Sequence, residues 1–232
     1  MKRAERKGSG YGRILGLLLS VPMVTGGGTA LGRPRGAAVG NPLPAVTVHV
    51  YNYAAVSDQT LEKGEKRAAH ILRAAGIEVT WVNCNAATTD IRQDANCAPQ
   101  AGPLSYDLRI AAHYRVRQGF NDGDSMGLAI LPNLASVSFG RVAEIAKDAG
   151  VAPWELLGLA IAHEMGHLLL GSDSHSRTGI MRPNWGPDDY RRFAPDQWCF
   201  TPHQGEMIHR QIASAAQEQG IQKGAAGAFG VR

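Results

Sequence analysis

The chain is expected to fold as one α+β domain with an α/β-like order of elements. Short segments of strand-like alternation are interleaved with two segments of helical character, at 58–75 and 154–170. The second of these segments is apolar nearly all round, which is typical of a helix buried in the body of a protein. We place the domain at 45–219, between a leader and linker at 1–38 and a disordered tail at 220–232.

The elements follow in order from their residue patterns. Val46, Val48 and Val50 alternate with polar residues and predict a first strand that continues to Tyr53. Helical spacing from Asp58 onward, stopped by a glycine at 76, predicts a helix, and alternation at 77–82 predicts a second strand. Further strands are expected from Leu108, at 127–131 and at 135–142, the last of them entering a short helix. A final helix is expected from 201–202 to about 219.

The most informative motif is H-E-x-x-H at 163–167. Histidines four residues apart lie on one face of a helix, so His163 and His167 can reach a single Zn²⁺. Glu164, next to the first ligand, is placed to act as the general base toward a water molecule on the metal. As core histidines without a metal, the pair would need two separate hydrogen-bonding arrangements, whereas one metal satisfies both.

A third ligand should come from beyond the helix, which Gly171 is expected to end. The run HEMGHLLLGSDSH, with Met181 downstream, resembles the metzincin clan of zinc metallopeptidases. The family pattern would place a glycine at 170 and the third ligand at 173, where this chain has Leu170 and Asp173. The later glycine favours His175 as third ligand, and Asp173, which corresponds to the Asp ligand of snapalysin-like metzincins, is the alternative.

The resemblance also implies a fold and further site residues. It implies a zincin-like catalytic domain with a mixed, twisted five-stranded sheet, an antiparallel edge strand, two long packed helices and a C-terminal helix. It makes Met181 a packing residue beneath the metal and makes the fourth strand the one that pairs with an extended substrate, at Gly127, Leu128, Ala129 and Ile130. The alternative interpretation, that this segment is an ordinary edge strand without a role in substrate binding, stays open. Tyr190 could stabilise an oxyanion, although packing is favoured.

The N-terminus is predicted to be an export signal. Basic residues precede an apolar run at 14–21 that is too short to span a bilayer, so cleavage rather than anchoring is expected. Residues 1–38 hold seven of the 24 Lys and Arg and one of the 20 Asp and Glu, which leaves 17 basic and 19 acidic side chains. We therefore expect a secreted or periplasmic monomer that binds a peptide or protein substrate, without nucleic-acid binding or a stable membrane anchor. The pair Arg191 and Arg192 is interpreted as a solvated surface pair.

Three cysteines accompany this exported chain. Cys84 and Cys97 bracket a polar loop and could close it as a disulfide that leaves Cys199 out, although other pairings stay open. None has the spacing of a zinc site.

The sequence thus predicts a secreted zinc metalloendopeptidase with Zn²⁺ held by His163, His167 and His175 and with Glu164 as general base. Two alternatives remain: a secreted zinc-binding module without activity, and a hydrolase of a narrow range of amides such as cell-wall peptides.

Overall fold

A computed structural model describes residues 43–84, 97, 104–113, 125–171, 174–192 and 197–228. All described residues belong to one compact unit, which lies within 41–232. The predicted leader at 1–38 therefore lies outside the described residues, as does most of the polar loop after the second strand. None of the described helices combines the length and apolarity needed to cross a membrane.

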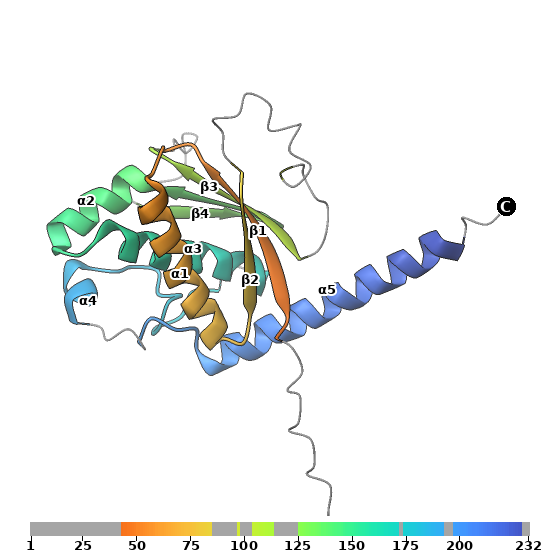
Figure 1. The fold of residues 1–232 in the computed structure, drawn as a ribbon. Coiled ribbons are helices and arrows are strands. Elements are labelled where there is room, and N and C mark those ends of the chain that lie inside the picture. The colour runs from red at the N-terminus through yellow and green to blue at the C-terminus, as the bar shows by residue number, and fades with distance from the viewer. Residues whose placement is uncertain are drawn as a thin grey trace, which may run out of the picture. The chain divides into compact units, whose positions relative to one another are not determined.

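Five strands form one mixed sheet in the order β2-β1-β3-β5-β4. The strands are β1 (Ala45–Asn52), β2 (Glu78–Asn83), β3 (Ser105–Ala111), β4 (Gly127–Ile130) and β5 (Leu134–Ser138). The first four in spatial order are parallel, and β4 is antiparallel to β5 at the edge (Figure 1). The mixed five-stranded sheet with an antiparallel edge strand is therefore confirmed.

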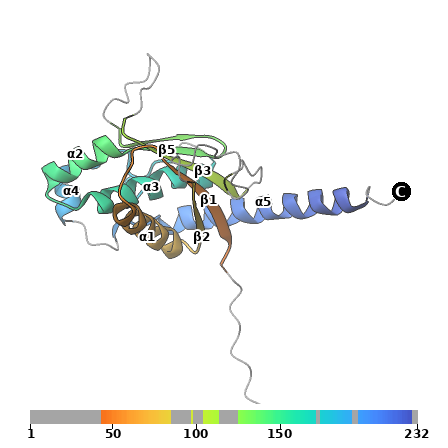
Figure 2. The same ribbon diagram turned by 45° about the horizontal axis from the view of Figure 1, so that its top comes forward.

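Helices α1 (Asp58–Ala74) and α3 (Pro153–Leu170) pack against each other beside the sheet (Figure 2). They approach closely because each has a glycine at the crossing. A Cβ at Gly64 would overlap Leu157, and a Cβ at Gly158 would overlap the side chain of Arg67. The buried faces of both helices and of β1, β3 and β5 make one continuous apolar core.

Two element boundaries differ from the sequence-based expectation. The fifth strand ends at Ser138, where α2 (Phe139–Ala149) begins, rather than continuing to 142. The apolar residues after 138 therefore belong to the buried side of a helix, with Val142 and Ala146 fully buried. The four residues 139–142 are too few to distinguish the period of a strand from that of a helix. The third strand begins at Ser105, three residues before the expected start, because β1 extends its ladder by pairing Thr47 with Ser105.

The last helix, α5 (Pro202–Ala228), is longer than the sequence indicates. It continues past 219 through part of the segment for which disorder is expected, and alanine, the best helix former, is frequent there. At its start, α5 is attached to the end of α1: His209 Nε2 donates to the carbonyl of Ala75 at 2.7 Å.

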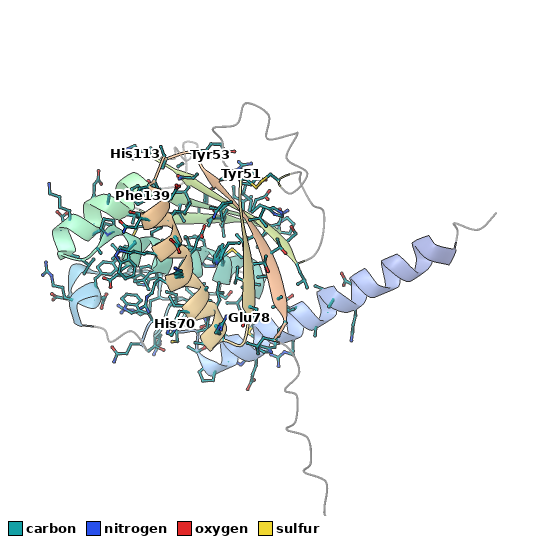
Figure 3. All side chains as sticks on the ribbon, in the orientation of Figure 1. Tyr51, Tyr53, His70, Glu78, His113 and Phe139 are labelled. Atoms are coloured by element: carbon teal, nitrogen blue, oxygen red, sulfur yellow. A yellow bond between two sulfur atoms is a disulfide. The ribbon has the colours of Figure 1, made fainter. Side chains whose placement is uncertain are left out.

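The predicted disulfide between Cys84 and Cys97 is confirmed. The bond lies at the end of β2 and packs against Tyr51, whose hydroxyl donates to the carbonyl of Cys97 at 3.3 Å (Figure 3). Cys199 lies elsewhere, on the segment that precedes α5, and its carbonyl accepts from the amide of Ile180 at 2.9 Å.

A buried carboxyl group on α1 predicts a pH-dependent stability. Glu65 is 6% exposed, and burial raises its pKa from 4.5 to about 7 against the opposing effect of a hydrogen bond with Asn83. The folded protein then binds more protons than the unfolded chain between pH 4.5 and 7, so this group lowers stability as pH rises through that window. Glu65→Gln removes the charge and should stabilise the fold by up to about 3 kcal/mol above pH 7.

Urea unfolding of Glu65→Gln and wild type at pH 5 and pH 8 tests this expectation. Glu206→Gln, which changes an exposed carboxylate on α5, is the matched control and should show little pH-dependent difference. An advantage of Glu65→Gln that is equal at both pH values would contradict a titrating buried carboxyl group.

Candidate metal centre

Helix α3 supplies the first two candidate ligands. Pro153 stands at its first position and Glu155 in its first turn, where the helix dipole favours a negative charge. Gly171 ends the helix in the left-handed conformation at φ 68°. Thirteen residues of this helix are buried, so the two histidines project from a rigid element of the core.

The structure brings His163, His167 and His175 together. One potential ligand nitrogen of each histidine lies within 4.8 Å of the others, and the Nε2 atoms of His163 and His167 are 3.2 Å apart. Among the described residues, this is the only group of three or more His, Cys, Asp or Glu side chains placed to hold a metal. The alternative ligand Asp173 lies outside the described residues.

Hydrogen bonding settles the tautomer of His163. Its Nδ1 lies 2.8 Å from the carbonyl oxygen of Ile180, and a carbonyl can only accept, so Nδ1 carries the proton. Burial lowers the pKa of His163 to about 4, so the ring is neutral at pH 7 with a lone pair on Nε2. A histidine held through one nitrogen by a carbonyl, with the other directed at the cluster, is the usual arrangement of a metal ligand.

Exposure increases across the three histidines. His163 is the most buried, His167 is intermediate and His175 is exposed. One side of the cluster therefore rests on the core while the other is open to solvent. Three imidazole donors with an open side fit the coordination of a catalytic zinc, which keeps a fourth position for water or substrate.

Glu164 is a residue of α3, and its side chain lies against the edge strand β4. The residue is 5% exposed, and a Cβ at Gly127 would overlap its carboxylate, so only glycine allows this approach. The candidate substrate strand is thus beside the candidate base. Ser125, which the sequence analysis did not single out, fastens the start of β4: its hydroxyl donates to the carbonyl of Gly127 at 2.7 Å and accepts from the amide of Gly127 at 3.3 Å.

Met181 is fully buried beneath α3. A Cβ at Gly166 would overlap the Met181 sulfur, so the glycine within the motif allows the methionine to lie against the helix. The chain turns just before this point, at Gly179 with φ 77°, and the amide of Ser176 donates to the carbonyl of Met181 at 2.8 Å. Met181 is thus a buried packing residue against α3, and its place beneath a bound metal stays a prediction.

A cluster of aromatic side chains packs against His163. Trp185 contacts the His163 ring edge to face at 5.1 Å between centroids and Trp198 at the same distance. Tyr190 stacks on Trp198 at 5.9 Å, and burial raises the pKa of its hydroxyl. Tyr190 thus has the packing environment that the sequence analysis favoured. The role of Trp185 was missed, because a single tryptophan in a turn has no periodicity that relates it to the motif.

Arg191 is not a purely solvated side chain. Its guanidinium group donates to the carbonyls of Ala149 at 2.9 Å and Asp148 at 2.8 Å, at the end of α2. It thereby attaches the short helix α4 (Pro187–Arg192) to α2, a helix-terminus interaction that spacing along the chain does not reveal.

Solved structures similar to this chain share little sequence identity with it. No protein-family model matches the chain, and no curated protein matches it. The crystal structure of archaemetzincin from Methanopyrus kandleri is similar over 78% of this chain and 98% of that chain, with a TM-score of 0.47 and 15% sequence identity. This similarity is too low to assign a function, which therefore depends on the geometry of the site.

Proposed function

We propose that the protein is a zinc-dependent metallopeptidase. The observation that carries the proposal is the convergence of His163, His167 and His175, whose ligand nitrogens lie within 4.8 Å of one another, beside the buried carboxylate of Glu164. Three imidazole nitrogen donors suit zinc better than the oxygen-preferring calcium or magnesium.

Each residue has a distinct role in this proposal. His163, His167 and His175 hold the metal, and zinc when bound would polarise the scissile carbonyl and activate a water molecule. Glu164 accepts the proton of the attacking water on its carboxylate and donates it to the leaving amine. Because Glu164 is nearly inaccessible to solvent, its carboxylate is kept in a fixed position against β4.

The edge strand β4 is proposed to bind the substrate backbone. Among the described strands it pairs only with β5, so an extended peptide could add a strand on its other side. The close approach of Gly127 to Glu164 would bring that peptide next to the general base. Leu128, Ala129 and Ile130 continue the strand away from this point.

We further propose that the mature protein is exported and acts as a monomer. The disulfide between Cys84 and Cys97 supports an oxidising compartment, in agreement with the basic and apolar leader. Expression with the leader in a bacterial host, followed by N-terminal sequencing of the extracytoplasmic protein, tests export. Recovery of the uncleaved chain in the cytoplasm would overturn it.

The test of the function combines metal analysis with hydrolysis. Purified mature protein should contain one zinc per chain, as implied by the one group of three histidines among the described residues, and should cleave casein. A chelator should abolish cleavage, and added zinc should restore it. Zinc without cleavage of casein or of a peptide library would favour a binding module, and cleavage restricted to cell-wall peptides would favour a narrow amidase.

A further inference from the structure

One loop contacts the imidazole of His163 at two points. We call the segment 180–190, which follows the turn at Gly179 and includes the first residues of α4, the clamp loop. The carbonyl of Ile180 accepts from His163 Nδ1 at 2.8 Å, and the ring of Trp185 meets the His163 ring at an interplanar angle of 90°. The hydrogen bond restricts rotation within the imidazole plane, while the indole restricts tilting of that plane.

Within the described part of the chain, ring packing holds Trp185 in this position. Its Nε1 is buried, and no described residue accepts a hydrogen bond from it. A buried donor without a partner is destabilising, so no hydrogen bond to a described residue favours this position of the indole. Trp198 instead supports it from another side, with ring centroids 5.1 Å apart and an interplanar angle of 78°.

An ion pair closes the clamp loop around Trp185. The two terminal nitrogens of Arg182 lie 3.1 and 3.2 Å from the two carboxylate oxygens of Asp189. Asp189 also accepts from the amide of Gly186 at 2.7 Å, directly after Trp185. The side chains are only 25% and 21% exposed, so this two-point pair is less screened than an ordinary surface pair.

We propose that the clamp loop is a positioning device for His163 and that the Arg182–Asp189 pair sets metal affinity without belonging to the histidine triad. The inference rests on the proposed metal site. A ligand that is already oriented loses little freedom when the metal binds, and loss of such outer support typically weakens metal affinity 10–100-fold.

The first test opens the loop by Asp189→Asn. This change keeps the size of the side chain and an oxygen for the Gly186 amide, but it removes the charge that pairs with Arg182. We expect zinc affinity, measured by competition with a chromophoric chelator, to fall about 10–100-fold, and the absorption spectrum of the cobalt-substituted protein to change. The melting temperature of the metal-free protein is measured alongside.

Glu78→Gln is the matched control for Asp189→Asn. It breaks the exposed pair of Arg73, at the end of α1, and Glu78, at the start of β2, whose atoms are 2.7 Å apart. Glu78 is labelled in Figure 3. Zinc affinity and the cobalt spectrum should be unchanged in this variant, because the pair does not contact the clamp loop or the histidines.

The second test separates ring packing from hydrogen bonding at Trp185. Trp185→Phe keeps an aromatic ring against His163 and removes the unpaired N–H, so zinc affinity should stay within about threefold of wild type. Trp185→Ala should lower the affinity about tenfold or more. Rescue by phenylalanine distinguishes positioning of His163 from a merely structural role, which would appear only in the melting temperature.

Zinc affinity of folded Asp189→Asn within about twofold of wild type would overturn the proposal. If Asp189→Asn does not fold, the two Trp185 variants decide the question. Equal zinc affinities of Trp185→Ala and Trp185→Phe would also overturn the proposal. Failure of the wild-type protein to bind zinc would instead overturn the proposed function, so the two failures are distinguishable.

Discussion

Glu164→Gln is expected to lower casein hydrolysis by a factor on the order of 10²–10⁴ while one zinc per chain remains bound. Glutamine has nearly the size of glutamate and can occupy the same space against Gly127, so the helix and the three histidines should be undisturbed. It cannot accept the proton of the attacking water, which is the step assigned to this carboxylate. The measurement is kcat/KM for a chromogenic peptide together with elemental analysis of the same sample.

Glu155→Gln is the matched control for this change. It makes the same substitution in the first turn of the same helix, far from the histidines, and should leave both zinc content and hydrolysis near wild type. Undiminished hydrolysis by Glu164→Gln would remove Glu164 from the mechanism. Loss of zinc from the same variant would instead make Glu164 part of the metal-binding group.

His175→Ala is expected to weaken zinc binding by a factor of about 100 or more, beyond the 10–100-fold effect typical of outer-sphere changes. The triad would be reduced to two donors from a single helix, and hydrolysis should fall with zinc content. Because His175 is exposed, the substitution creates no cavity in the core, and the melting temperature of the metal-free protein should be nearly unchanged.

Asp173→Ala is the comparison that decides the third ligand. The residue lies outside the described part of the chain, so its assignment remains a prediction. If His175 is the ligand, Asp173→Ala should retain zinc under conditions where His175→Ala does not. The opposite ranking would transfer the role to Asp173 and leave His163 and His167 as assigned.

Most elements of the fold could be predicted from local patterns. Alternation of Val46, Val48 and Val50 identified β1, and the apolar character of α3 identified it as a buried helix. Boundaries were less accurate where two periods meet, as at Ser138, because short apolar runs suit either a strand or a helix. The burial of Glu65 had no sequence indication, since α1 and the end of β2 enclose it only after they pack.

The sequence alone determined that His163 and His167 share a helix face and that Glu164 stands beside them, because the period of a helix sets distances over four residues. It also determined which cysteines could close the loop after β2. Only the tertiary structure decided that His175 returns to the same point, that Gly127 allows β4 to lie against Glu164, and that Ile180 and Trp185 hold His163. These contacts join segments without a common period, so their distances depend on how the core packs rather than on spacing along the chain.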